Sequence, residues 1–187
     1  MPFILRVARF LLAVAAFAPA LAPAQLPALY GTQRDPMQHF FSPSLGDLRA
    51  ELADAKRAGK QAAFFMYVRD DCLYCERMKQ NILSLSGVQA YYRKHFAVLA
   101  VDIRGSVPIS DFAGKPTTEQ AFAAAQGVKF TPVIIFYGFD GKPLTRIDGE
   151  IRSAEDFVQL GDFVLSGAYK TMKFADFQQS TSSARVR

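Results

Sequence analysis

The sequence predicts an α/β fold of three layers, in which a mixed central sheet of about four strands carries helices on both faces. Two observations lead to this prediction. The element patterns follow the order helix, strand, helix, strand, helix, strand, strand, helix, so two crossover connections precede a hairpin. The strand candidates are apolar along their whole length, as expected for strands that are covered on both faces.

The first helix is predicted over residues 45–58. Apolar residues recur at helical spacing from Leu45 to Ala55, Ser44 is the candidate N-cap, and Gly59 ends the helix. The unbroken apolar run 62–68 then predicts a buried central strand.

The middle of the chain continues this alternation. A helix beginning near Cys72 is predicted to continue to about Leu85, where Ser86 can cap a further short helix. Residues 96–103 form the second strand candidate, and residues 104–116, with two glycines and two prolines, are predicted to be a loop insertion.

The last elements are a helix, two strands and a final helix. Thr117 or Thr118 can cap the helix, and Ser153 opens the final one in a pattern like a capping box. Asp140-Gly141 is a strong hairpin signal. The predicted ranges are 119–125 for the helix, 133–137 and 144–147 for the strands, and a start at residue 153 for the final helix.

Four segments are expected along the chain. Residues 1–24 are predicted to be a signal peptide, 25–43 an extended N-terminal arm, 44–176 the folded domain and 177–187 a disordered polar tail. The sequence shows no internal repeat.

The signal peptide is predicted from its charge and apolar pattern. Arg6 and Arg9 precede an uncharged run, and Ala22-Pro23-Ala24 offers small residues for cleavage before Gln25. The alternative is an uncleaved membrane anchor, although prolines interrupt the run. Because no cysteine follows directly, a lipoprotein anchor is not expected. A periplasmic location is therefore expected.

Charge and size limit the classes of function. Removal of Arg6 and Arg9 with the signal lowers the net charge from +5 to +3, which is too weak to indicate a nucleic-acid partner. About 160 residues remain, enough for one domain with its own core.

The two cysteines of the chain, Cys72 and Cys75, form a Cys-x-x-Cys pair between the first strand candidate and a helix. This arrangement is used for thiol–disulfide exchange. As a structural crosslink it would do little, because closing a four-residue ring contributes only about 2 kcal/mol. The pair therefore indicates chemistry, with no cofactor beyond its own redox-active disulfide.

The position of each sulfur predicts its role. Cys72 would lie at a helix N-terminus, where unpaired N–H groups and the helix dipole favour an anion, so it is the candidate nucleophile. Cys75, one turn further on, would be shielded and would act as the resolving thiol.

These features together resemble the thioredoxin superfamily, and within it the exported thioredoxins of the SoxW type, named for bacterial sulfur-oxidation systems. The residues that carry the resemblance are the strand, Cys72-x-x-Cys75 and helix, then Gly127 to Pro132, and then Arg146-Ile147-Asp148-Gly149. The resemblance implies that the Thr131-Pro132 peptide is cis and receives the substrate chain beside the cysteines, with Leu73 and Tyr74 as further substrate-binding residues.

Three positions depart from the thioredoxin pattern. Asp71, preceded by Asp70, replaces the usual aromatic residue before the first cysteine, and both carboxylates should oppose a Cys72 thiolate, which favours a reductant or an intermediate potential. These acids could equally be solvated loop residues. Leu73-Tyr74 stands in place of Gly-Pro. Met66 falls where thioredoxins place a buried carboxylate, so release of the mixed disulfide would need water or Glu76 instead.

The predicted function is a periplasmic thiol–disulfide oxidoreductase that acts on disulfides of exported proteins, with the reducing direction favoured and a membrane-bound electron donor as partner. The alternative is a non-enzymatic metal carrier or assembly module on the same fold. Isomerase activity is a third possibility. No metal site is expected, since the spacing of His39 and His95 from the cysteines matches no compact zinc motif. The sequence does not indicate an oligomeric state.

Overall fold

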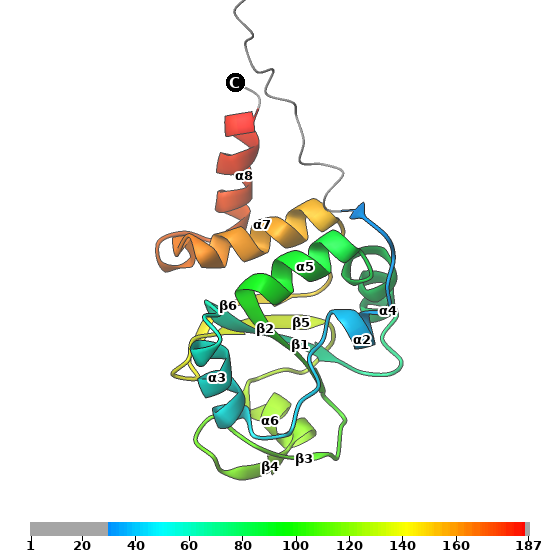
Figure 1. Cartoon of the computed structure of the whole chain (residues 1–187), viewed down its shortest axis with the longest axis vertical. Helices are drawn as coiled ribbons and strands as arrows, with labels where there is room; N and C mark the ends of the chain where they lie inside the picture. The colour runs from blue at the N-terminus through cyan, green and yellow to red at the C-terminus, as the bar shows by residue number, and fades with distance from the viewer. Residues whose placement is uncertain (1–29, 186–187) are drawn as a thin grey trace, which may run out of the picture.

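The computed structural model describes residues 30–185 and has a four-stranded mixed sheet at its centre (Figure 1). The strand order is β2-β1-β5-β6, with β1 parallel to β2 and the other two pairs antiparallel. The strands are β1 Ala62–Val68, β2 Phe96–Asp102, β5 Val133–Tyr137 and β6 Pro143–Asp148. This confirms the predicted fold class. The predicted signal peptide, residues 1–24, lies outside the described residues.

Strand β1 is buried along nearly its whole length because both of its faces contribute to a core. Phe64 and Met66 point into one cluster together with both cysteines, which we call the cysteine-side core. Phe65 and Tyr67 point into the other, which we call the tyrosine-side core. Successive side chains of a strand alternate between faces, so an uninterrupted apolar run is what two covered faces require.

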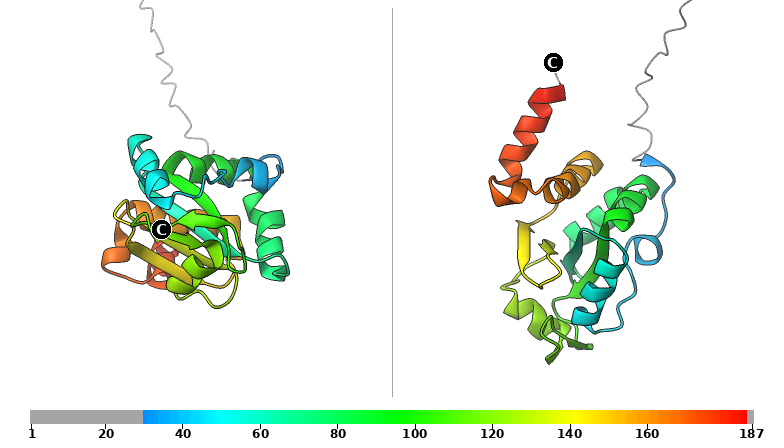
Figure 2. Two further views of the ribbon diagram at one scale, coloured as in Figure 1. Left: turned by 90° about the horizontal axis from the view of Figure 1, so that it is seen from below. Right: turned by 60° about the vertical axis from the view of Figure 1, so that its left-hand side comes forward.

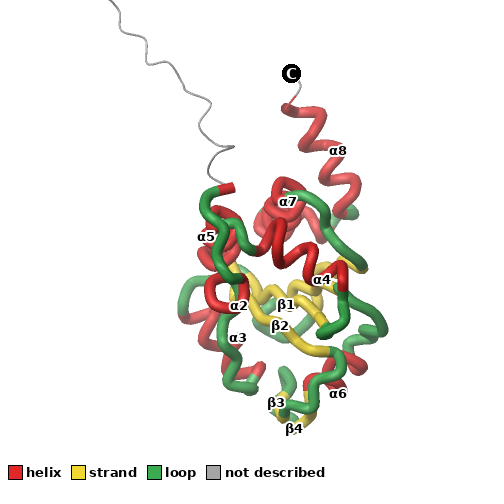
Figure 3. The backbone as a smooth tube through the Cα atoms, turned by 90° about the vertical axis from the view of Figure 1, so that its right-hand side faces the viewer, coloured by secondary structure: helices red, strands yellow, loops and turns green. Residues whose placement is uncertain are grey.

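Helices cover both faces of the sheet, so the protein has three layers (Figures 2 and 3). The cysteine-side core is covered by α4 Leu73–Met78, the π-helical turn η1 Lys79–Leu83, α5 Ser86–His95 and α7 Ala154–Leu165, while α2 Pro36–His39 has no buried residue and lies directly before the buried Phe40 and Phe41. The tyrosine-side core is covered by α3 Leu48–Arg57, α6 Glu119–Ala125 and the small hairpin of β3 Pro108–Ser110 with β4 Pro116–Thr118.

The N-cap residues of three helices can be compared with those predicted from the sequence. Thr118 and Ser153 cap α6 and α7 through their side chains, as predicted. Helix α3 begins later than predicted, at Leu48, because Asp47 accepts the hydrogen bond from Ala50 N. The predicted cap, Ser44, instead donates its hydroxyl to Glu51 at 2.6 Å.

The predicted loop insertion, residues 104–116, contributes strand β3 and leads into β4. Ile109 of β3 is buried in the tyrosine-side core, which explains why a segment rich in glycine and proline still forms a hairpin.

The N-terminal arm is not extended throughout its described part, since it contains α2. Phe40 and Phe41 follow this short helix and are buried; the ring of Phe40 contacts that of Phe41 and those of Phe64, Tyr92 and Phe157. The arm is therefore part of the cysteine-side core.

The tail predicted to be disordered from residue 177 is instead helical, because α8 runs over Phe174–Arg185 and projects from the domain (Figure 2). It follows the short 3-10 turn η2 Ala168–Lys170. Phe174 and Phe177 contact Phe163 of α7, and Gln178 donates to Asp156 at 2.8 Å. These contacts anchor the first turns of α8 on α7. The polar composition of the tail gave no indication of this helix. Over the described residues, no helix is long and apolar enough to cross a membrane.

Candidate active site

Loops from all four strands meet at one end of the sheet, which we call the site end. The register places the last residue of β1 beside the last of β2, and the first residue of β5 beside the last of β6. Since β1 and β5 are antiparallel, the segment that leaves β1 toward Cys72 and the segment Thr131-Pro132 that enters β5 lie at this same end. The topology thus places the predicted site residues, which are distant in sequence, at the same end of the sheet.

Cys72 and Cys75 form a disulfide with their Cα atoms 5.2 Å apart. Cys72 is the N-cap residue of α4, and its sulfur accepts a hydrogen bond from the Cys75 backbone N–H at 3.1 Å. Cys72 keeps 3% of its surface exposed, whereas Cys75 is fully buried. The N–H at the helix start would stabilise a thiolate on Cys72, and Cys72 is also the slightly more exposed residue of the pair.

The surroundings of the disulfide on its inner side are apolar. Met66 is fully buried and belongs to the same core cluster as both cysteines. Glu76 is the acid that could replace the missing buried carboxylate when the mixed disulfide is released. Its carboxylate forms an ion pair with Lys79 at 2.8 Å.

The Thr131-Pro132 peptide bond is cis, and the Pro132 carbonyl accepts a hydrogen bond from Gly149 N at 3.0 Å. Within the described part of the chain, the backbone N–H and C=O of Thr131 make no hydrogen bond. Its side-chain oxygen is buried and is also without a partner there. Phe130, just before it, is a half-exposed aromatic residue. Main-chain groups of this segment are therefore free to pair with another chain.

The two residues between the cysteines are exposed to solvent, Leu73 at 70% and Tyr74 at 51%. The guanidinium of Arg77 lies over the Tyr74 ring, 5.2 Å from its centroid, and binds Glu150 at 2.9 Å. Glu150, from the loop after β6, also contacts Arg152 at 3.4 Å. These contacts orient Tyr74 and tie α4 to the end of β6.

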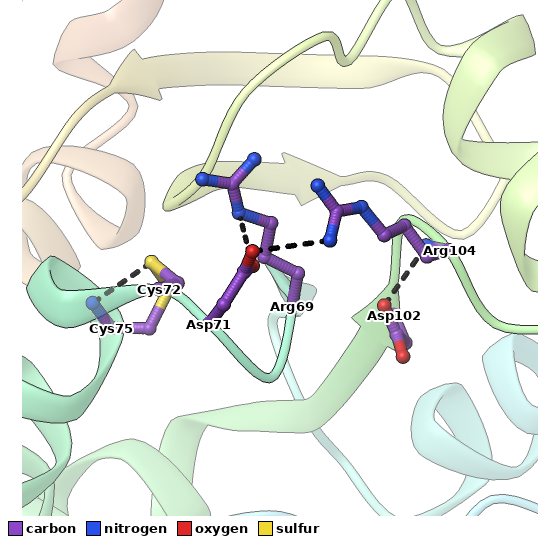
Figure 4. A network of polar contacts seen from close by, with 6 residues as sticks. All are labelled: Arg69, Asp71, Cys72, Cys75, Asp102 and Arg104. Atoms are coloured by element: carbon purple, nitrogen blue, oxygen red, sulfur yellow. Dashed lines mark hydrogen bonds and ion pairs between the residues drawn. A yellow bond between two sulfur atoms is a disulfide. The ribbon is translucent and has the colours of Figure 1, made fainter.

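Asp71 is not simply solvated, because two arginines bind its carboxylate (Figure 4). Arg69 Nε lies 2.7 Å from one oxygen, and Arg104 Nη1 lies 3.2 Å from the other. From the sequence, the two acids alone are expected to oppose a Cys72 thiolate; the two arginines are a finding of the structure. Arg69 could have been found two residues away, but Arg104 follows a different strand and carries no local signal. Asp70 makes no ion pair among the residues that the structure describes.

His39 ends α2 and His95 ends α5, and the His39 carbonyl accepts a hydrogen bond from Arg93 of α5 at 3.1 Å. Within residues 30–185, no three side chains of the metal-binding types come together in a group.

Comparisons with known proteins identify the fold. A family profile described as a thioredoxin-like domain matches residues 48–165. A thioredoxin-fold protein from Helicobacter pylori superposes with a TM-score of 0.55 and 19% sequence identity, over 86% of this chain and 91% of that chain. A structure named DsbH oxidoreductase gives a TM-score of 0.50 and 18% identity, over 80% of this chain and 94% of that chain. A search of curated proteins finds no match.

Proposed function

The chain belongs to the thioredoxin-like domain family, and from that premise we propose that it is a periplasmic thiol–disulfide oxidoreductase acting on disulfides of exported proteins. The observation that carries this proposal is the disulfide between Cys72 and Cys75 at the start of α4, in which Cys72 is the N-cap residue and the slightly more exposed of the two. One structural neighbour bears the name of an oxidoreductase, which agrees with this assignment.

The reaction uses the two sulfurs in turn. In the reduced protein, the Cys72 thiolate attacks a substrate disulfide, forms a mixed disulfide and releases one substrate thiolate, which takes up a proton. The Cys75 thiol then loses its proton and attacks Cys72, which re-forms the Cys72–Cys75 bond and releases the second substrate thiol. The substrate gains two electrons and two protons, and the protein returns to the disulfide form.

The substrate segment docks at the site end. The free backbone groups of Thr131 favour an extended chain that pairs as an added strand. Leu73, Tyr74 and Phe130 are the large apolar side chains exposed around this segment, and they would contact the residues that flank the substrate disulfide. Pro132 fixes the backbone next to Thr131 and cannot itself donate a hydrogen bond.

We further propose the reducing direction with an intermediate potential. The unpaired carboxylate of Asp70 opposes a Cys72 thiolate, whereas the arginines around Asp71 compensate the second acid. A membrane-bound donor would then supply electrons in the periplasm, where free thiols are otherwise oxidised. Export rests on the predicted signal peptide, and the SoxW-type subgroup stays a prediction.

Reduction of insulin disulfides, with dithiothreitol as the source of electrons, tests the proposal. The wild-type protein is expected to accelerate the reaction, and Cys72→Ser is expected to reduce it to the uncatalysed rate because the attacking sulfur is lost. Cys75→Ser should instead accumulate a mixed disulfide between Cys72 and the substrate, visible as a mass increase that dithiothreitol removes.

The two variants control for one another, since each removes one sulfur from the same helix and the same core. Full activity in Cys72→Ser would contradict the assigned nucleophile. An inactive wild-type protein that forms no mixed disulfide in either variant would contradict the proposed function itself.

A further inference from the structure

The residue before the nucleophile is part of a three-residue ion-pair cluster formed by Arg69, Asp71 and Arg104 (Figure 4). Each arginine approaches a different oxygen of the Asp71 carboxylate, at 2.7 Å from Arg69 Nε and 3.2 Å from Arg104 Nη1. The two guanidinium groups come from loops that follow different strands, β1 and β2. The cluster therefore joins the loop that carries Cys72 to the neighbouring loop.

The backbone around Arg104 is held in place by several hydrogen bonds. Arg104 N donates to Asp102 Oδ1 at 2.9 Å, and Ile103 N donates to the Val68 carbonyl at 2.9 Å. At Gly105, a Cβ atom would lie 2.2 Å from Glu119 Oε2, so the turn fits closely over α6. Arg104 thus reaches Asp71 from a fixed backbone position and not from a free loop.

The cluster carries a net positive charge next to the reactive sulfur. Asp71 directly precedes Cys72, and consecutive Cα atoms lie only about 3.8 Å apart. The cluster is thus centred on the residue adjacent to the nucleophile, and charges separated by less than the Debye length, about 10 Å at ordinary salt, are only partly screened from one another. Asp71 alone would disfavour a thiolate, whereas one carboxylate with two guanidinium groups favours it.

Most other charged groups at this end are paired, but Asp70 adjoins Asp71 on the same loop and makes no ion pair among the described residues, so it opposes part of the cluster's positive charge. Glu76 binds Lys79, and Glu150 binds both Arg77 and Arg152. Arg146 binds Asp148 at the end of β6, Glu119 accepts a hydrogen bond from Asp102 N, and Asp102 and Lys129 are the other charged residues near this end.

We propose that Arg69 and Arg104 are positioning residues: they hold Asp71 in a cluster of net charge +1, and this cluster stabilises the Cys72 thiolate that reduction releases. The inference deepens the proposed exchange reaction and rests on it. The cluster makes the disulfide a stronger oxidant than the two acids alone would allow, because stabilising the thiolate favours the reduced form.

Equilibration with glutathione makes the effect measurable. Two glutathione thiols become one glutathione disulfide, and the Cys72–Cys75 bond breaks. The Cys72 sulfur leaves as the thiolate, the Cys75 sulfur takes one of the two protons, and the other proton goes to solvent. A group that stabilises the Cys72 thiolate shifts this equilibrium toward the reduced protein.

Four variants separate charge from structure. Arg104→Ala lowers the net charge of the cluster from +1 to zero and Asp71→Asn raises it to +2, while the double variant returns it to +1. Arg104→Lys keeps the charge. Arg57→Ala is the matched control, since it breaks an exposed ion pair with Asp54 far from the site.

Two quantities are measured: the pH profile of Cys72 alkylation by iodoacetamide, and the equilibrium constant with glutathione. Arg104→Ala is expected to move the alkylation profile to higher pH and to shift the equilibrium about two- to fivefold toward the disulfide, the range for exposed charge pairs. Asp71→Asn should shift both in the opposite direction. The double variant, Arg104→Lys and Arg57→Ala should remain close to wild type.

Unchanged profiles in both single variants, or shifts in the same direction, would overturn the inference. A double variant that is as impaired as Arg104→Ala would also overturn it, because the effect would then be structural. Failure of the proposed function looks different: the wild-type pair would not equilibrate with glutathione at all, while the alkylation profiles would still report the charge effect.

Discussion

The two ends of the central sheet differ in the ion pairs that hold their helices and loops in place. At the end opposite the site, which we call the turn end, ion pairs are local: Asp54 binds Arg57 in one helix, and Asp140 binds Lys142 in one turn. At the site end, two ion pairs span long sequence separations, 33 residues for Asp71 with Arg104 and 73 for Arg77 with Glu150.

This difference follows from what each end has to do. The turn end only reverses the chain, and backbone bonds such as Gly138 N to the Lys142 carbonyl at 2.9 Å suffice. The site end leaves the backbone groups of Thr131 unpaired and exposes Leu73 and Tyr74. Besides backbone bonds such as Ile103 N to the Val68 carbonyl, long-range ion pairs hold the loops together there while the backbone groups of Thr131 stay unpaired. We expect stability to depend on backbone geometry at the turn end and on charge at the site end.

The largest effect is expected at the turn end, from Gly141→Ala. Gly141 has φ +75°, and an added Cβ would lie 2.7 Å from Phe112 Cβ. The left-handed conformation and the overlap with Phe112 together should cost about 3 kcal/mol of unfolding free energy. Urea unfolding measures this change, and the exchange activity of the folded protein should be unchanged.

Gly59→Ala is the matched control, because Gly59 has φ +71° but no atom within 4 Å of an added Cβ. It should cost only about 1 kcal/mol, from the conformation alone. Equal losses in the two variants would show that contact with Phe112 does not matter at the turn end.

The next largest change in unfolding free energy is expected from breaking an ion pair at the site end, with an ion pair at the turn end as the comparison. The side chain of Glu150 is largely buried and forms ion pairs with Arg77 and Arg152. Glu150→Gln should therefore lower the unfolding free energy by about 1 kcal/mol. Asp54→Asn breaks an exposed local pair at the turn end and should change it by less than about 0.5 kcal/mol. If Asp54→Asn costs as much as Glu150→Gln, the proposed contrast between the two ends does not hold.

The smallest effect is pH-dependent and concerns Glu119, which lies under the loop that carries Arg104. Partial burial raises the pKa of Glu119 above its usual value of 4.5; the hydrogen bond from the Asp102 backbone N–H lowers it by less, and the charge of Asp102 adds a smaller upward contribution. A raised carboxyl pKa favours folding below the unfolded pKa, and this contribution is lost as the pH rises through the folded pKa.

Glu119→Gln should therefore be slightly more stable than wild type at neutral pH, by less than about 0.5 kcal/mol because the carboxyl group is still partly exposed. The advantage should shrink as the pH falls toward the unfolded pKa. Chemical unfolding at several pH values measures it, and an advantage that grows at low pH would contradict the assigned direction.

The sequence predicted the elements whose signal is local. The strand Ala62–Val68 is apolar throughout, and the Cys72-x-x-Cys75 pair is visible within one segment. The start of α3 was misplaced because Ser44 and Asp47 are both suitable caps, and only the fold shows that Ser44 binds Glu51 instead.

The cluster around Asp71 could not be predicted, because Arg104 reaches it only through the parallel pairing of β1 with β2. The helical tail was missed for a similar reason. Its polar residues suggest disorder, and the contacts of Phe174 and Phe177 with Phe163 depend on where α7 ends.

A redox titration of the wild-type protein tests the central claim most directly. The protein is equilibrated over a range of glutathione redox ratios, and its free thiols are labelled and counted by mass. The account predicts one two-electron transition in which Cys72 and Cys75 change together between disulfide and dithiol. A pair that stays bonded across the whole range, or thiols that remain unlabelled after reduction, would contradict it.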